Sequence, residues 1–283
     1  GAASARNFLI DKARGKYLYF MDADDWAEET MLEDMFDFAE ANKLELVICG
    51  YYIDTYYAED KYYRELRTAP DAVFESQQEF RNYAYKLFDA QLLYAPWNKL
   101  YLASYIKENK IYYPKTFWDD LPFNLEVVRN IKRVGCMNKR YYHFLRARGE
   151  AENTKYRPNM YEKREEENKL MRELFNYWKI DTPELREYLA RRHAERLIGC
   201  LENITNSACK LSYKEKKAEI KKILDSASAK QALQDAKSTS IMIAALYFPM
   251  RKKLVPIVFL ENKFISFVKT RNTNIFARLK ANR

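Results

Sequence analysis

The stretch YLYFMDADDW, residues 17–26, decides the fold, because a run of apolar and aromatic residues ends there on three carboxylates. A short aromatic run without polar alternation predicts a fully buried β-strand over residues 16–21. A helix over residues 28–42 and a second strand, LELVICGYY at 44–52, are predicted to follow. Strand, helix and strand in this order predict a right-handed crossover between parallel strands. We therefore expect an α/β fold.

Three acidic residues, Asp22, Asp24 and Asp25, directly follow the first predicted strand. Ligands of α/β sheets bind beyond the carboxyl ends of the strands. Clustered carboxylates repel one another unless a cation compensates them, and hard oxygen ligands suit Mg²⁺ or Mn²⁺. The alternative interpretation is that Asp24 or Asp25 caps the following helix. On its own, the D-x-D-D pattern leaves both interpretations open.

Composition and charge limit the class of protein. A chain of 283 residues with 48% hydrophobic content can bury the core of one large or two smaller domains. Its four cysteines lie far apart without a C-x-x-C pair, which predicts neither a zinc site nor a disulfide framework and favours the reducing cytoplasm.

Most of the net charge of +9 lies near the C-terminus, where residues 210–283 hold 17 lysines and arginines against 5 acidic residues. Such a segment is either a solvated helical surface or a contact for an anionic membrane or nucleic acid. It contains no recognisable motif for reading nucleic acid, so we expect no nucleic-acid partner.

Five short motifs follow one another along the N-terminal half of the chain. They are GAASARN at 1–7, ARGKYL at 13–18, FMDADDW at 20–26, PWNKLY at 96–101 and FWDDLPF at 117–123. Their ordered series resembles the family 2 glycosyltransferases over about residues 1–150. The resemblance implies a GT-A fold with a Rossmann-like mixed sheet, a nucleotide-sugar donor and a divalent cation, Mn²⁺ or Mg²⁺. Residues 1–155 are the expected GT-A portion, and residues 156–283 a helical C-terminal region.

The resemblance also implies roles for residues on the donor side. Asp24 would bind the metal that bridges the donor diphosphate, Asp22 would reach the ribose or the sugar, and Arg6 would lie near the donor. The chemical reason is that the leaving diphosphate gathers negative charge as the glycosidic bond breaks, and a metal held there stabilises that charge.

On the acceptor side, Asp120 aligns with the catalytic base that takes the proton from the acceptor hydroxyl. Asp119, which stands where the family usually has Glu, would be its neighbour and an acceptor contact. The competing interpretation is that this pair caps a helix predicted over residues 121–133, and both roles can coexist.

Three further residues are candidates by position. His143, in a predicted strand KRYYHFLRA, would supply a third metal ligand, although a single histidine on an aromatic strand is more often a core or surface residue. Trp97 and Asn98 match the family segment that borders the acceptor site, whereas a tryptophan is more often a core anchor.

The N-terminal motifs of the family do not precede Gly1. Family members begin with strands that bind the base and ribose of the donor, including an Asp-Asp-Gly-Ser segment. We therefore expect this chain to lack the N-terminal part of the nucleotide-binding domain, with strands that would be central lying at an edge. We expect the chain alone not to be an efficient enzyme.

Residues 240–260, SIMIAALYFPMRKKLVPIVFL, contain two apolar blocks split by three cations. Each block is too short to span a bilayer. One interpretation places residues 240–283 peripherally on an anionic membrane, at the inner face of the cell membrane. The other is a last core helix broken at Pro249 and Pro256.

Taken together, the sequence predicts a metal-dependent glycosyltransferase that moves a sugar from a nucleotide-sugar donor to a glycan or lipid-linked acceptor in surface polysaccharide synthesis. One alternative is a non-catalytic membrane-associated or scaffold module derived from such an enzyme. The other is a phosphatase of the haloacid dehalogenase type. That class expects Thr or Val shortly after its second Asp, where this chain has Asp25 and Trp26.

Overall fold

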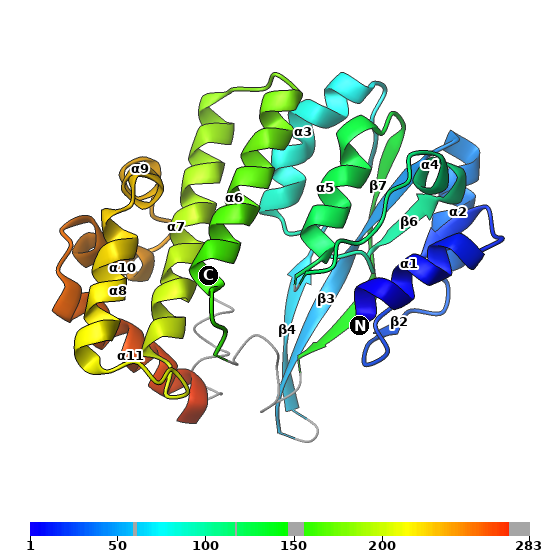
Figure 1. Cartoon of the computed structure of the whole chain (residues 1–283). Helices are drawn as coiled ribbons and strands as arrows, with labels where there is room; N and C mark the ends of the chain where they lie inside the picture. The colour runs from blue at the N-terminus through cyan, green and yellow to red at the C-terminus, as the bar shows by residue number, and fades with distance from the viewer. Residues whose placement is uncertain (59–60, 117, 147–155, 272–283) are drawn as a thin grey trace. The chain divides into compact units, whose positions relative to one another are not determined.

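The computed structural model contains two compact units, both visible in Figure 1. The first unit comprises residues 1–56, 64–146 and 173–180, and the second contains the other described residues. The predicted boundary after residue 155 adjoins a stretch outside the described residues, and Phe117 of the FWDDLPF motif also lies outside them. The structure describes residues 1–58, 61–116, 118–146 and 156–271.

A seven-stranded mixed sheet forms the first unit's scaffold. Its order is β1-β6-β3-β7-β2, and β4 and β5 pair with β3 and β7 respectively. The helical segments of the second unit follow it along the chain, which confirms the predicted fold class. The strands are β1 (Tyr17–Tyr19), β2 (Trp26–Ala27), β3 (Leu46–Ala58), β4 (Lys61–Arg67), β5 (Ala72–Val73), β6 (Lys99–Leu102) and β7 (Val134–Arg146).

Strand β1 differs from the predicted strand in length, burial and neighbour. It covers three residues, and only Leu18 among them is buried, so the prediction of a fully buried strand over 16–21 is wrong. β1 pairs antiparallel with β6, which pairs antiparallel with β3. β1 and β3 therefore run in the same direction, as predicted, but β6 lies between them. β1 forms one edge of the sheet in the described part of the chain.

Strand β3 is buried in the centre of this sheet. Residues 46–49 are completely buried, as expected for a strand covered on both faces. The parallel register with β7 shifts on both sides of Gly50. A Cβ at this position would lie 2.6 Å from the carbonyl oxygen of Arg67, so the close approach of the neighbouring strand requires glycine.

Helices pack against the sheet of the first unit. The helix predicted to begin at residue 28 begins at Met31, with Thr30 at its N-cap position, so neither Asp24 nor Asp25 caps it. Ser76 caps α3 by accepting a hydrogen bond from the backbone N–H of Glu79. The helices are α1 (Ala2–Lys12), α2 (Met31–Asn42), α3 (Gln77–Asp89), α4 (Ala103–Glu108) and α5 (Asp120–Asn130).

The second unit is helical, with α7 at the centre of its core, where Leu197 and Leu201 are completely buried. α6 continues into the first unit from residue 173. No helix in the described ranges is long and apolar enough to cross a membrane. The helices, coloured green to red in Figure 1, are α6 (Met160–Tyr177), α7 (Pro183–Thr205), α8 (Tyr213–Asp225), α9 (Ala227–Asp235), α10 (Ile241–Arg251) and α11 (Val255–Arg271).

Two stretches of this unit each form two helices. Residues 212–236 form α8 and α9, because Ser226 ends the first helix and its hydroxyl caps the second. Residues 240–260 divide between α10 and α11. Pro249 lies inside α10 rather than ending it, and Pro256 lies in the first turn of α11, where proline is tolerated.

Candidate active site

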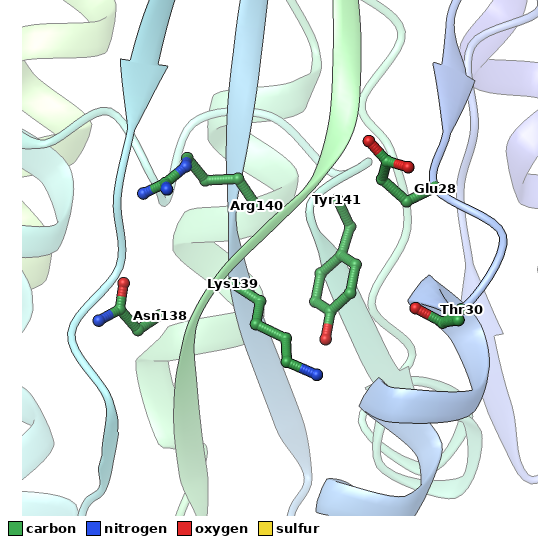
Figure 2. Close-up of a pocket in the computed structure, with 6 residues that line it drawn as sticks. All are labelled: Glu28, Thr30, Asn138, Lys139, Arg140 and Tyr141. Atoms are coloured by element: carbon green, nitrogen blue, oxygen red, sulfur yellow. The ribbon is translucent and has the colours of Figure 1, made fainter.

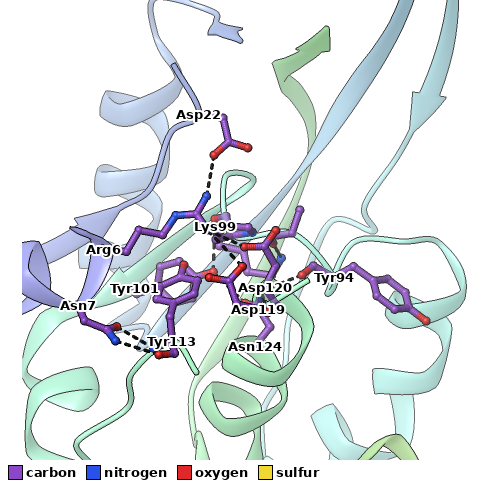
Figure 3. Close-up of polar contacts among 12 residues, drawn as sticks. Arg6, Asn7, Asp22, Tyr94, Lys99, Tyr101, Tyr113, Asp119, Asp120 and Asn124 are labelled. Atoms are coloured by element: carbon purple, nitrogen blue, oxygen red, sulfur yellow. Dashed lines mark hydrogen bonds and ion pairs between the residues drawn. The ribbon is translucent and has the colours of Figure 1, made fainter. Parts of the chain in front are cut away.

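Arg6 of α1 joins two acidic segments that lie far apart in the sequence (Figure 3). Its Nη2 donates to Oδ1 of Asp22 at 2.8 Å, and its Nη1 donates to Oδ1 of Asp120 at 3.0 Å. Oδ1 of Asp119 lies 3.8 Å from the same Nη1. These four residues, here called the Arg6 cluster, were all predicted as site residues. The structure brings them together at the end of β1 and the start of α5.

The residue after Arg6 fixes the helix that carries it. The side-chain amide of Asn7 donates to the carbonyl of Tyr113 at 2.9 Å and accepts from the Tyr113 N–H at 2.8 Å. The guanidinium of Arg6 lies 5.1 Å from the centroid of the Tyr113 ring, within the range of a cation–π contact. In the Ala-Arg-Asn motif, the arginine therefore binds the acids and the asparagine anchors α1 to the chain ahead of α5.

An aromatic cluster supports the Arg6 cluster. The rings of Tyr113 and Phe123 stack with centroids 3.9 Å apart. Phe20 meets the rings of Tyr101 and Tyr113 edge-on, with centroids 5.5 Å apart in both pairs. Such pairs stabilise a packed core beyond the area they bury. Phe20, between β1 and the acidic turn, thus fixes the backbone that presents Asp22.

Asp120 has the properties of a base that works near neutral pH. Burial raises the pKa of its carboxyl to about 6, although the charge of Arg6 opposes this rise. About a third of its side chain, 35%, still faces solvent, so a ligand can reach it. Asp119 occupies the N-cap position of α5 without a side-chain capping hydrogen bond, so it does not cap the helix. The interpretation of Asp119 as a capping residue is therefore wrong.

The Arg6 guanidinium keeps its charge in this setting. Burial disfavours the charged form, but the carboxylates of Asp120 and Asp22 outweigh it and raise the pKa of Arg6 above its ordinary value. A permanent cation between carboxylates removes the repulsion that would otherwise separate them. Arg6 therefore serves as the compensating charge for three of the predicted acids.

Lys99 is an unpredicted ionisable residue behind the same cluster. Its side chain is completely buried, and Nζ donates to Oδ1 of Asn98 at 2.8 Å. Burial lowers the pKa of its ammonium to about 7, while the charges of Cys49 and Asp120 favour the protonated form. A buried lysine with this pKa is a group whose charge responds to ligands that bind near it.

The three acids of the opening stretch separate into three environments. Asp22 binds Arg6, as described above. Asp25 is buried, and its carboxylate accepts from the Tyr142 hydroxyl at 2.6 Å and from the Leu145 N–H at 2.7 Å. Asp24 is exposed, and within the described ranges it has no hydrogen bond or ion pair. Asp25 thus attaches the turn to β7, while Asp24 is available to a ligand.

Tyr142→Phe is expected to lower the free energy of unfolding by about 2 kcal/mol, because it removes a donor from a buried carboxyl group. Burial already raises the pKa of Asp25 to about 6, and the hydrogen bonds from Tyr142 and Leu145 oppose this rise. Urea denaturation followed by circular dichroism measures the loss.

Tyr141→Phe is the matched control for this substitution. Its hydroxyl bonds the carboxylate of Asp34, which water reaches more easily, so we expect a smaller loss. Equal losses for the two variants would show that the bond to Asp25 does not anchor the turn.

His143 lies in β7 with both ring nitrogens engaged by carboxylates. Nδ1 lies 2.9 Å from Oδ2 of Asp54, and Nε2 lies 3.0 Å from Oε1 of Glu28. The buried imidazole stacks between the rings of Trp26 and Tyr52, with centroid distances of 3.5 and 4.5 Å. Ligation of a cation through Nε2 would therefore have to replace Glu28. Metal binding by His143 stays a prediction.

Trp97 and Asn98 lie in the core of the first unit. The Trp97 ring stacks on Tyr142 with centroids 4.4 Å apart. Asn98 is completely buried, and its amide donates to the carbonyls of Cys49 and Leu92 at 3.0 and 3.1 Å. Their positions explain why the PWNKLY segment needs these residue types for packing. Their predicted place beside the acceptor stays a prediction.

The exposed carboxylates fit a metal site in which the protein supplies few of the ligands. No group of three or more His, Cys, Asp or Glu side chains able to hold a metal occurs in the described part of the chain. Mg²⁺ commonly binds through one or two carboxylates and completes its shell with water and substrate phosphates. The exposed carboxylate of Asp24 fits a cation that arrives with a diphosphate, rather than one caged by protein.

Tyr113, like Lys99, was not among the predicted site residues. The Tyr113 hydroxyl is buried and has no hydrogen-bond partner among the residues that the structure describes, and its ring contacts Arg6. Its position in IYYPKT, just ahead of the Asp119–Asp120 pair, is the one sequence signal that could have indicated it. A buried hydroxyl without a partner beside charged groups is a candidate contact for a ligand.

A separate, open hollow of about 520 Å³ lies beside β7 and the start of α2 (Figure 2). It shares no residue with the Arg6 cluster, and most of its lining side chains are exposed and polar. Among its lining residues, Glu28 contacts the predicted site residue His143. The lining residues are Glu28, Thr30, Asn138, Lys139, Arg140 and Tyr141.

Known proteins resemble this chain in sequence and in structure. It is 24% identical over 241 residues to the uncharacterized glycosyltransferase EpsJ of Bacillus subtilis (strain 168), covering 83% of this chain and 67% of EpsJ. It is 26% identical over 225 residues to the poly(ribitol-phosphate) beta-N-acetylglucosaminyltransferase TarP of Staphylococcus aureus (strain N315), covering 76% of this chain and 64% of TarP. The chain thus spans about two thirds of the length of each.

A solved structure, S. aureus TarS 1-349 in complex with UDP-GlcNAc, aligns with a TM-score of 0.49 and 20% identity over 92% of this chain and 70% of that one. The family model described as Glycosyl transferase family 2 matches residues 1–109, which include Arg6, Asp22 and Asp24. Its match agrees with the GT-A resemblance of the ordered motifs. Residues 1–109 of this chain are therefore similar to glycosyl transferase family 2.

Proposed function

We propose that this protein is a metal-dependent glycosyltransferase that moves a sugar from a nucleotide-sugar donor to a glycan or lipid-linked acceptor in surface polysaccharide synthesis. The observation that carries the proposal is the pairing of Arg6 with both Asp22 and Asp120, which puts the predicted donor and acceptor acids in one cluster. The names of EpsJ and TarP support the class of reaction, and the TarS complex contains a nucleotide sugar.

On the donor side, Asp24 would hold Mn²⁺ or Mg²⁺ together with the donor diphosphate, and Asp22 would contact the ribose or the sugar. When bound, the cation would neutralise the charge that develops on the leaving diphosphate. Arg6 holds Asp22 in place at 2.8 Å and brings a fixed positive charge to the donor side. His143 would join the cation if Glu28 gave up its Nε2 contact.

On the acceptor side, the Asp120 carboxylate would take the proton from the acceptor hydroxyl as that oxygen attacks the sugar. Asp119 would accept a hydrogen bond from a second acceptor hydroxyl. Trp97 and Asn98 would support this side from the core, since Asn98 binds Lys99 and the charge of Lys99 acts on Asp120.

The transfer rate is expected to fall as the pH drops below about 6. The base works only when deprotonated, and burial raises the pKa of Asp120 to about 6. Below that pH, kcat/KM should decrease about tenfold per pH unit, and above it the rate should level off. Initial rates of nucleotide release between pH 4.5 and 8 measure the profile. A flat profile between pH 5 and 7 would contradict a base with this pKa.

The proposal itself is tested by incubating the full-length protein with a panel of nucleotide sugars, Mn²⁺ and a glycan or lipid-linked acceptor. We expect release of nucleoside diphosphate from one donor, dependent on acceptor and abolished by EDTA. Donor binding without turnover on any acceptor would favour the scaffold alternative. Hydrolysis of simple phosphate esters instead would favour the phosphatase alternative.

A further inference from the structure

Helix α11 carries a row of large apolar side chains on its outer face. The row, here called the apolar stripe, consists of Ile257, Leu260 and Phe264, which are 45, 63 and 66% exposed. Their spacing of three and four residues puts them on one side of a helix. Scattered exposed apolar residues are ordinary, but a continuous row of three indicates an interaction surface.

The opposite face of α11 packs into the core of the second unit. Val258 and Phe259 belong to the hydrophobic core of the second unit, and Asn262 is buried beside them. Asn262 donates its side-chain amide to the carbonyl of Val258 at 2.8 Å. α11 is therefore apolar on both sides, and folding of the second unit accounts for only one of them.

Helix α10 shows the same arrangement. Ile243 and Tyr247 face the core, whereas Ile241 and Phe248 are strongly exposed. Ala244 and Ala245, which share the outer face with them, are also exposed. The outer face of α10 thus adds to the exposed apolar surface of this part of the chain.

Cations accompany these apolar faces. The guanidinium of Arg251 donates to the carbonyls of Leu233 and Ala236, and Lys253 pairs with Asp225, so these two stabilise the turn between the helices. Lys252 lies in that turn, and Lys263 lies beside the apolar stripe on α11. Both are exposed.

We propose that the outer faces of α10 and α11 lie in the headgroup region of an anionic lipid bilayer. The apolar stripe would enter the boundary of the acyl chains, while Lys252 and Lys263 would contact anionic headgroups. The charge favours lipid over a second copy of the chain, because two copies facing each other would bring these lysines together. The inference rests on α10 and α11 and does not depend on the transfer reaction.

Co-sedimentation of the full-length protein with vesicles tests the proposal. We expect binding to phosphatidylcholine vesicles that contain 30% phosphatidylglycerol, and weaker binding to pure phosphatidylcholine. The double variant Leu260→Ser/Phe264→Ser should lower the partition coefficient at least tenfold. Lys252→Gln/Lys263→Gln should lower it about fivefold per lysine at low salt, and this effect should shrink at high salt.

The matched control is Phe8→Ser/Leu32→Ser, which removes two similarly exposed apolar residues from the first unit. Its vesicle binding should equal that of the wild type. Thermal unfolding shows whether each variant is folded, and Phe264→Ser alone replaces the double variant if the latter unfolds. Transfer to a soluble acceptor should be unchanged in the stripe variants, which separates this proposal from the proposed reaction.

Two results would overturn the proposal. One is equal sedimentation of the wild type and the stripe variant with anionic vesicles. The other combines two observations. Light scattering without lipid would show a wild-type dimer that Leu260→Ser/Phe264→Ser dissociates, and the wild type would not bind vesicles. That second result would show that another copy of the chain covers the stripe.

Discussion

Asp120→Asn should reduce the turnover of sugar transfer by at least about 100-fold, because a positioned general base contributes about 10²–10⁴ to the rate. Asparagine has nearly the same shape and keeps an oxygen that can accept the hydrogen bond from Arg6 Nη1, now 3.0 Å long. The affinity for the donor should therefore change by no more than about threefold, because the hydrogen bond to Arg6 is kept and only its strength changes. Calorimetric titration with the donor and initial rates, measured on one preparation, separate the two effects.

Glu126→Gln is the control for this experiment. Glu126 lies on the same helix, and its one ion pair among the described residues is with Arg129, one turn away at the surface. Glu126→Gln should change neither the turnover nor the affinity for the donor. If Asp120→Asn instead loses donor binding along with turnover, Asp120 acts with Arg6 in holding the donor side, and its assignment as the base fails.

Asp24→Ala should abolish Mn²⁺-dependent transfer, with a loss of more than about 100-fold, since a metal that stabilises developing charge supplies several kcal/mol. The side chain is exposed and makes no hydrogen bond or ion pair in the described part of the structure, so the variant should fold normally. Mn²⁺ titrations of donor binding and of turnover measure the loss.

The neighbouring acids supply controls with different outcomes. Glu29→Ala, an exposed acid shortly after the turn, should leave Mn²⁺ dependence unchanged. Asp25→Asn should lower stability, because the Asp25 carboxylate holds the turn through Tyr142. Full Mn²⁺-dependent activity in Asp24→Ala would remove Asp24 from the metal site and leave the donor side without its predicted ligand.

The sequence predicted the members of the Arg6 cluster but not the different environments of the neighbouring acids Asp24 and Asp25. Arg6, Asp22 and Asp120 lie in separate motifs, and only the order of those motifs indicated that they belong together. Asp24 and Asp25 are adjacent and chemically identical, so no local rule separates them. What separates them is Tyr142, which is 117 positions away from Asp25. Long-range partners of this kind decide which acid is exposed.

The fold was predicted best where periodicity is strong and worst at short elements. The helical character of the C-terminal region was predicted, but its division into separate helices at serine caps such as Ser226 was not. The four-residue strand β6, KLYL, was missed because four residues carry no clear period, and it separates β1 from β3. Lys99 was missed for the same reason, since only the sheet shows that this lysine points into the core.

A crystal structure of the full-length protein with Mn²⁺ and the nucleoside diphosphate of its donor tests the central claim most directly. The account predicts a manganese peak, identified by its anomalous signal, on the carboxylate of Asp24 and bridged to the diphosphate, with Arg6 and Asp22 beside the nucleotide. Nucleotide bound elsewhere, for example in the hollow lined by Glu28 and Tyr141, with the Arg6 cluster unchanged, would contradict it.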